Sequence, residues 1–137
     1  MATTFLDAAR DYEDIFELCE TIDAARRASV KEVIGIIPYL PHSRQERRED
    51  GMRTTISARL LADMLQVSGL DRIITMDVHT TAIEGFYKIP FDNLDPMAVI
   101  TEKIKSLTLS NPVIVSPDLG GIKRAKKYAK ALGFKMA

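Results

Sequence analysis

The chain has 137 residues, of which 46% are hydrophobic and 28% are charged. These fractions are typical of a globular domain and exclude a disordered chain, a collagen-like repeat and a disulfide-bonded miniprotein. Nineteen basic residues balance nineteen acidic ones, so no overall field favours nucleic acid or a membrane surface. Any site for an anion has to be local.

Cysteine content and hydropathy indicate the compartment. Cys19 is the single cysteine and cannot form an internal disulfide, which suits a reducing environment. No apolar run approaches the roughly 18 to 20 residues that span a bilayer, and the first ten residues lack the apolar core of a signal peptide. We therefore expect a cytoplasmic protein without a membrane-spanning segment.

The first half of the chain alternates between helical and extended patterns. Apolar residues at helical spacing predict a helix over 11–29, and the β-branched run at 32–37 predicts a buried strand. The charged stretch 39–52 predicts a loop. A second helix is expected between a cap at Thr54 or Thr55 and a terminating Gly69, with a second strand over 72–78.

The same alternation continues to the end of the chain. Residues 95–106 predict a third helix, 112–116 a third strand and 120–132 a final helix. Alternating strands and helices favour an α/β fold with a parallel sheet and flanking helices. Three strands are few for such a sheet, so we expect the fold to be incomplete.

Polar clusters follow each of the three predicted strands. Residues 38–48 contain Arg44, Gln45, Arg47 and Arg48, residues 77–81 contain His79, and residues 116–121 contain Asp118 before Gly120 and Gly121. Ligands of open parallel sheets bind beyond the carboxyl ends of the strands, so we expect these three clusters to converge on one edge. Taken singly, each has an ordinary structural explanation: a solvated loop, a hydrogen-bonded histidine and a turn residue.

The residue types at these strand ends suit phosphate chemistry. Arg44, Gln45 and Arg47 can grip a polyphosphate through charge-assisted hydrogen bonds. His79 and Asp118 offer a nitrogen and a hard oxygen ligand, and Mg²⁺ bound with a nucleotide takes only one or two protein groups. Backbone N–H groups near Gly120 and Gly121 can approach a phosphate at a helix start. The chain has no Walker loop, no G-x-G-x-x-G after a strand and no zinc-ligand spacing.

Five segments in this order resemble the ribose-phosphate pyrophosphokinases, or phosphoribosyl pyrophosphate (PRPP) synthetases. They are TIDAARRAS at 21–29, PYLPHSRQERR at 38–48, DVH at 77–79, GFYKIPFDN at 85–93 and VSPDLGG at 115–121. The resemblance extends from about Asp11 to the end of the chain. It implies a phosphoribosyltransferase-like fold, with residues 1–94 as an incomplete N-terminal domain carrying an ATP-binding loop and 95–137 as the start of a C-terminal domain.

The resemblance also implies a reaction and roles for individual residues. The family transfers the diphosphoryl group of ATP to ribose 5-phosphate and releases AMP, with Mg²⁺, and its members are homo-oligomers. By resemblance, Arg44, Gln45 and Arg47 contact ATP, and His79 contacts the phosphates and a magnesium ion. Asp118, with Gly120 and Gly121, lies on the second metal or ribose-phosphate side.

Several positions depart from the family's pattern. Ala82 stands where a Gln is usual, and Tyr87 stands where a Phe is usual. The acidic pair Glu49-Asp50 precedes Gly51 but lacks the apolar strand that leads into the family's PRPP-binding loop, and nothing before Asp11 resembles the family's first strands. We therefore expect a truncated chain that is inactive alone.

Two alternatives stay open at this stage. The first is a catalytically silent homologue that associates with active synthetase subunits, an interpretation that Ala82 favours. The second is a nucleic-acid-binding module that uses Arg44 to Arg48, against which the zero net charge and the lack of an aromatic stacking array count.

Overall fold

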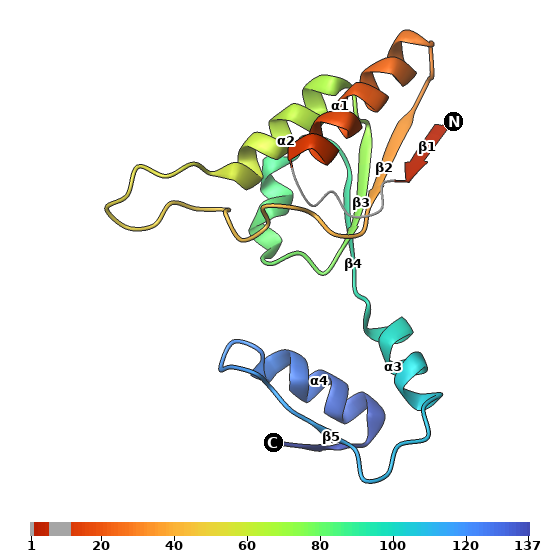
Figure 1. Ribbon diagram of the computed structural model, residues 1–137, viewed down its shortest axis with the longest axis vertical. Coiled ribbons are helices and arrows are strands. Elements are labelled where there is room, and N and C mark those ends of the chain that lie inside the picture. Colours follow the sequence, from red (N-terminus) through yellow and green to blue (C-terminus); the bar gives the residue numbers. More distant parts are fainter. Residues whose placement is uncertain (1, 6–11) are drawn as a thin grey trace. The chain divides into compact units, whose positions relative to one another are not determined.

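A computed structural model describes residues 2–5 and 12–137 of the chain (Figure 1). The chain divides into two compact units, residues 1–94 and residues 95–137. Each unit has its own sheet, and each is described separately below. No helix in the described part of the chain is both long and apolar enough to cross a membrane.

The first unit is built on a parallel sheet of four strands. In sheet order these are β1 (Ala2–Phe5), β2 (Val33–Ile37), β3 (Arg72–Met76) and β4 (Phe91–Leu94). The register places Ile34 beside Arg72 and Ile73 beside Phe91. Parallel neighbours need crossover connections, and here these contain α1 (Tyr12–Arg27), α2 (Ser57–Ser68) and the 3₁₀-helix η1 (Thr81–Phe86).

The core of this unit lies between the sheet and its crossover helices. Since the strands follow chain order, right-handed crossovers place their helices on the same face of the sheet. Accordingly α1 packs beside α2, and α2 contacts η1 (Figure 1). Fully buried apolar side chains of this layer come from α1, β2, α2, β3 and η1, and they include Ile22, Val33, Ile37, Ala62, Leu65, Ile73 and Ile83.

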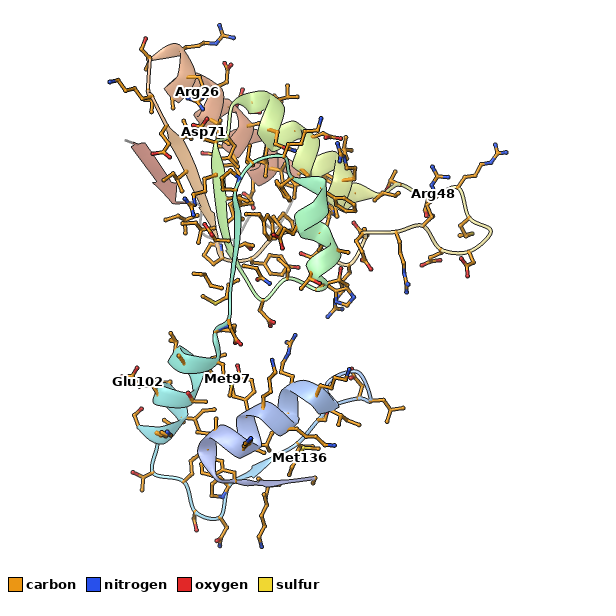
Figure 2. All side chains as sticks on the ribbon, turned by 180° about the vertical axis from the view of Figure 1, so that it is seen from behind. Arg26, Arg48, Asp71, Met97, Glu102 and Met136 are labelled. Carbon is orange, nitrogen blue, oxygen red and sulfur yellow. The ribbon has the colours of Figure 1, made fainter. Side chains whose placement is uncertain are left out.

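The ends of α1 and α2 are fastened to the sheet by Arg26. Its guanidinium donates hydrogen bonds to the carbonyls of Gly69 at 2.7 Å and Val30 at 3.2 Å, and it pairs with Asp71 (Figure 2). Asp71 in turn accepts a 2.7 Å hydrogen bond from the N–H of Val33, the first residue of β2. The helix ends thereby fix where β2 and β3 begin.

The second unit contains two helices and a two-stranded parallel sheet. Its elements are α3 (Met97–Lys105), β5 (Val113–Ile114), α4 (Ile122–Leu132) and β6 (Lys135–Met136). The strands pair Val113 with Lys135 and Ile114 with Met136. Only Ala125 and Ala129, both on α4, are buried among the described residues of this unit.

The predicted α/β fold with a parallel sheet and flanking helices is confirmed. The helices lie within a few residues of the predicted bounds, although Asp11 lies outside the described residues. Gly69 ends α2 in the left-handed conformation, as expected, with a φ of 107°. The predicted cap at Thr54 or Thr55 is wrong, because Ile56 precedes α2 and the Thr55 hydroxyl bonds to the Ser57 hydroxyl at 2.9 Å instead.

Two predictions about the strands are corrected. The sequence indicated three strands, whereas β1, β4 and β6 were missed because they have four, four and two residues and no sustained apolar run. The predicted convergence of three strand ends on one edge is also wrong. β5 pairs with β6 in a separate sheet, so the segment around Asp118 does not leave the sheet of β2 and β3.

Candidate functional site

The loop between β2 and α2, residues 38–56, leaves the carboxyl edge of the four-stranded sheet. Leu40 and Pro41 are buried and anchor its start. The Ser43 hydroxyl donates a hydrogen bond to the Leu40 carbonyl, and His42 adopts a left-handed φ of 58°, which turns the chain sharply. Beyond this anchor the loop extends away from the sheet and carries Arg48 outward (Figure 2).

The turn at the base of the loop is held by His42. Its Nδ1 lies 2.6 Å from Gln45 Oε1 and, because an amide oxygen only accepts, this nitrogen carries the proton. Gln45 N–H donates to the His42 carbonyl at 2.8 Å, and the ring of Tyr12 stacks on the imidazole with centroids 5.7 Å apart. The first turn of α1 therefore supports the loop, and the Gln45 amide nitrogen stays available as a donor.

A hollow of about 740 Å³ lies along this loop. Its lining residues are mostly polar: Tyr12, Arg44, Gln45, Arg47, Arg48, Glu49, Asp50, Thr54, Thr55 and Ser57. The volume lies within the range of small-molecule sites, roughly 300–1,000 Å³. The lining combines three guanidinium groups with two carboxylates, and Thr54, Thr55 and Ser57 add hydroxyl donors. Such a lining suits an anion with several oxygen atoms.

Glu46 belongs to the same loop and is less exposed than Arg44 and Arg47 beside it. Its side chain is only 12% exposed, and Oε1 lies 4.0 Å from the Nε of Arg47. The other carboxylate oxygen, Oε2, is buried without a hydrogen-bond partner among the described residues. A buried orphan oxygen of this kind is unusual in a folded protein. Because Glu46 lies next to Arg47, its carboxylate can restrict the orientation of the Arg47 guanidinium.

His79 follows β3, the strand adjacent to β2. Because β2 and β3 are parallel, His79 leaves the sheet at the same edge as the arginine loop. Asp77 before it has a φ of 48°, and Val78 N–H donates to Asn93 Oδ1 at 3.3 Å, so the backbone here is fixed to the end of β4. The imidazole is exposed and has no hydrogen-bond partner among the described residues. It does not line the hollow beside Arg44.

Asp118, Gly120 and Gly121 form the turn before α4 in the second unit. Asp118 Oδ1 accepts a hydrogen bond from Gly121 N–H at 2.7 Å, and the Ser116 hydroxyl donates to the Asp118 carbonyl at 2.7 Å. A Cβ on Gly121 would lie 2.7 Å from the Ser116 oxygen, so the tightness of this turn requires glycine there. The second oxygen of the Asp118 carboxylate faces an exposed region.

A second hollow, of about 530 Å³, lies beside η1. It is lined by Thr81, Ala82, Glu84, Gly85, Tyr87, Ile89, Pro90 and Phe91. The Tyr87 hydroxyl is buried without a hydrogen-bond partner in the part of the chain that the structure describes, and burial raises the pKa of this phenol far above its usual value. Its ring packs at a tilt against Phe91, with centroids 4.9 Å apart.

The described side chains do not form a cluster that could hold a metal ion by itself. In residues 2–5 and 12–137 no group of three or more His, Cys, Asp or Glu side chains lies close enough together to hold a metal ion. The described chain therefore offers no metal cage of its own. Magnesium that accompanies a nucleotide needs only one or two protein groups, since waters and phosphate oxygens supply the rest. His79 and Asp118 each fit only this mode, in which one protein group binds a magnesium ion that a nucleotide carries.

Sequence patterns missed part of this lining. Tyr12 stands 30 residues before His42, and only the tertiary packing of α1 brings their rings together. The sequence pattern predicts only a helix cap at Thr54 or Thr55 and assigns no part to Ser57, although all three residues line the hollow. The cluster of small hydroxyl side chains directly after an arginine-rich loop is the signal that could have identified them.

The fold and this site define an α/β protein with a parallel sheet and a cationic strand-end loop, the class in which phosphorylated ligands bind beyond the strands. Residues 6–69 match the N-terminal domain of ribose phosphate pyrophosphokinase. A ribose-phosphate pyrophosphokinase from Vibrio parahaemolyticus is 46% identical over 121 residues, which are 88% of this chain and 38% of that protein. The protein of the same name from Aquifex aeolicus is 44% identical over 121 residues, which cover 39% of its length.

A solved structure agrees with the sequence matches. The crystal structure of phosphoribosylpyrophosphate synthetase from Mycobacterium smegmatis superposes with a TM-score of 0.82 and 37% identity, covering 94% of this chain and 44% of that one. Over most of its length the chain is similar to ribose-phosphate pyrophosphokinases. It spans about two fifths of the length of the curated relatives that it matches. The family match begins at residue 6, earlier than the resemblance from Asp11 indicated.

Proposed function

We propose that the loop at residues 38–56 binds the polyphosphate chain of ATP. We further propose that the chain contributes this site to an enzyme that transfers a diphosphoryl group from ATP to ribose 5-phosphate and releases AMP. The observation that carries the proposal is the 740 Å³ hollow at the carboxyl edge of the sheet, lined by Arg44, Gln45, Arg47 and Arg48. The names of the relatives support the reaction class.

Each lining group has a definite part in this proposal. Arg44 and Arg47 present planar guanidinium groups that bind phosphate oxygens in pairs. Gln45 donates its amide N–H to the nucleotide while its oxygen stays bonded to His42. Glu46 acts as a positioning residue for Arg47, from which it lies 4.0 Å away. The hydroxyls of Thr54 and Thr55 complete the donor set on the far wall of the hollow.

His79, Asp118, Gly120 and Gly121 are proposed to act on the reacting side. The exposed imidazole of His79 would contact the phosphates, and Asp118 with the two glycines would lie toward the ribose phosphate. In the transfer, the ribose 1-hydroxyl oxygen bonds to the β-phosphorus of ATP, the bond from that phosphorus to the α-phosphate oxygen breaks, and the hydroxyl proton is lost. Stabilising the phosphate charge is the main requirement. Magnesium, when bound with ATP, would supply part of that charge, with His79 or Asp118 as a single protein contact.

We also propose that the 137-residue chain binds ATP without turning it over. The run Glu49-Asp50-Gly51 is the segment most similar to a PRPP-binding loop, and it lies in an exposed turn closed by a 3.0 Å hydrogen bond from Met52 N–H to the Glu49 carbonyl. It does not follow a strand, so it cannot occupy the strand-end position that a ribose-phosphate cradle needs. Cytoplasmic location, homo-oligomerisation of a full-length protein and the absence of nucleic-acid binding stay predictions.

Titration with an ATP analogue tests the binding proposal. Arg44→Ala and Arg47→Ala should each weaken binding at least about tenfold, because each removes a charge-assisted contact. Arg53→Ala is the matched control, since it removes the same charge from the same loop but from outside the hollow. It should leave affinity nearly unchanged. Equal losses in all three variants would show a nonspecific charge effect and contradict the proposed site.

A catalytically silent homologue remains the second candidate. Ala82 is exposed beside the second hollow at the position where the family's pattern has an amide, so a contact near His79 is lost. Restoring the amide with Ala82→Gln distinguishes the candidates in a mixture with active synthetase subunits. If Ala82→Gln raises the affinity for nucleotide, the enzymatic role is favoured. If Ala82→Gln leaves nucleotide affinity unchanged but alters the activity of the partner subunits, the catalytically silent homologue is favoured.

A further inference from the structure

The hollow along the arginine loop contains an aromatic wall that phosphate binding does not explain. Tyr12, the first residue of α1, is 78% exposed and lines this hollow. The other described residues of the lining are all polar or charged. Phosphate oxygens bind to guanidinium, amide and hydroxyl donors, but they gain nothing from the face of a ring. The ring of Tyr12 therefore points to a ligand that carries a flat apolar part as well as phosphates.

His42 holds this ring in place from one side. The imidazole stacks on the Tyr12 ring with centroids 5.7 Å apart and an interplanar angle of 29°. The imidazole is itself fixed, because its Nδ1 lies 2.6 Å from Gln45 Oε1. Packing of this kind uses one face of the tyrosine ring, and the high exposure of Tyr12 leaves most of the rest open. A ring that is supported in advance loses little freedom when a ligand stacks on it, which favours binding.

The arginines and the ring suit different parts of one ligand. Arg44 directly precedes Gln45, whose side chain is bonded to the histidine that supports the ring. Arg48 is carried outward along the loop (Figure 2). A nucleoside triphosphate has both parts that this arrangement suits, namely a chain of phosphates and a flat heteroaromatic base. The hollow, at about 740 Å³, has the volume of a site for a ligand of that kind.

Resting on the proposed binding of ATP by the loop at residues 38–56, we infer that Tyr12 is the platform on which the base of the nucleotide stacks. The base lies on the face of the ring opposite His42, and the phosphates lie along Arg44 and Arg47. Every base has a π-face, so the platform tolerates different bases and favours the larger purine rings. Tyr12 thereby makes the site prefer a nucleotide over a free polyphosphate, which the arginines alone would bind.

Exposure alone does not place an aromatic ring at this hollow. Phe16, one turn further along α1, is 60% exposed, and Tyr39, directly after β2, is 62% exposed, yet neither lines this hollow. A role in the hydrophobic core is excluded for Tyr12 by its exposure. A role as mere support for His42 makes a different prediction from a stacking platform, because it would affect every ligand of the loop equally.

Titration of the 137-residue chain with two ligands tests the inference. The ligands are magnesium-ATP and inorganic tripolyphosphate with magnesium, which supplies the phosphates without a base. Tyr12→Leu should weaken ATP binding at least about fivefold, the lower end of the range for stacking of a base on an aromatic side chain. The affinity for tripolyphosphate should stay within about twofold, because the arginines are unchanged. Tyr12→Phe keeps the ring and should retain the affinity for both ligands.

Tyr39→Leu is the matched control, since it makes the same substitution at an exposed tyrosine outside the hollow. It should leave both affinities unchanged, and circular dichroism checks that each variant is folded. If Tyr12→Leu weakens ATP and tripolyphosphate equally, Tyr12 only supports the loop and the platform is overturned. A loss confined to ATP, with GTP unaffected, would show recognition of the edge of the base and would also contradict stacking.

Proton NMR of bound ATP gives a signature that a supporting residue would not produce, and it does not depend on how Tyr12→Leu folds. Stacking on a tyrosine ring moves the proton resonances of the adenine base upfield. The shift should appear with the unchanged chain and with Tyr12→Phe. Unshifted base protons, on ATP that still binds in an Arg44-dependent way, would overturn the platform and leave the phosphate site intact. If neither ATP nor tripolyphosphate binds, the proposed function fails and the platform fails with it.

Discussion

His42 Nδ1 donates a 2.6 Å hydrogen bond to Gln45 Oε1, and this contact joins the base of the arginine loop to one of its proposed ATP-binding residues. The same imidazole stacks on Tyr12, so α1 supports the loop through a histidine that is not itself one of the residues lining the hollow. The orientation of the Gln45 amide therefore depends on a residue outside the lining.

Substituting His42 should weaken ATP binding without removing any charge from the hollow. His42→Phe keeps a ring for Tyr12 but loses the hydrogen bond, which is worth about 0.5–1.5 kcal/mol and corresponds to a loss of affinity of up to about tenfold. The titration used for the arginine variants measures this. His42→Asn, which can still donate to Gln45, should retain more affinity than His42→Phe; the reverse order would argue against the hydrogen bond.

Arg26 should contribute more to stability than its neighbour Arg27. Arg26→Met removes the hydrogen bonds to the carbonyls of Gly69 and Val30 and leaves Asp71 unpaired, so we expect a loss of about 2 kcal/mol in the free energy of unfolding. Arg27 pairs with Asp23 on the surface of α1, and Arg27→Met should have little effect. Urea denaturation compares them, and equal losses would contradict the account.

The Asp71 carboxylate should make stability depend on pH in the acid range. Burial alone raises its pKa, but the Val33 N–H and the Arg26 guanidinium outweigh this and hold the pKa below its ordinary value. A lowered folded-state pKa gives stability that is present above the unfolded pKa, near 4, and lost as the pH falls through the folded value. Asp71→Asn should therefore flatten the decline in unfolding free energy below about pH 4. If Asp71→Asn leaves the decline in unfolding free energy unchanged, Asp71 is not the source of that decline.

Tyr87→Phe should not destabilise the first unit. The Tyr87 hydroxyl is buried and has no hydrogen-bond partner among the described residues, so removing it relieves a desolvation cost of about 1–3 kcal/mol and leaves the ring contact with Phe91 intact. We expect the thermal midpoint to stay the same or to rise. A clear drop would mean that a water or a ligand in the second hollow satisfies the hydroxyl.

Gly69→Ala should be more harmful than Gly51→Ala. Both glycines have positive φ, at 107° and 75°, which costs an L-residue about 1 kcal/mol. A Cβ at Gly69 would also lie 2.7 Å from Cγ of Arg26, whereas no atom of residues 2–5 or 12–137 lies within 4 Å of a Cβ at Gly51 beyond its chain neighbours. The difference in unfolding free energy between the two variants isolates this contact with Arg26. Equal effects would show that Arg26 moves aside without cost.

Much of the fold was predictable because its core elements carry strong local patterns. The buried run at β2 and the apolar stripe of α2 each satisfy one periodicity over many residues, which leaves little choice of structure. β4 is different, since Phe91–Leu94 is short and polar and is held in the sheet by pairing to β3 and by the Arg72–Asp92 ion pair. Such a strand depends on its neighbour, so its own residues carry little signal.

The site was predictable to the same extent. Arg44, Gln45 and Arg47 stand together after a strand, and this shared position is what suggests the proposed role in ATP binding. Tyr12 approaches His42 only in the folded unit, and the separate sheet of β5 and β6 is decided by which strands find partners. The site therefore follows from sequence where its residues are neighbours in the chain, and it needs the structure where distant segments meet.

Phosphorus NMR of magnesium-ATP mixed with the 137-residue chain tests whether the loop at residues 38–56 binds the nucleotide. The β- and γ-phosphate resonances should broaden or shift, Arg44→Ala should abolish the change, and Arg53→Ala should not. Phosphate resonances that stay unchanged at saturating chain, or that change equally with Arg44→Ala, would contradict nucleotide binding by the loop at residues 38–56.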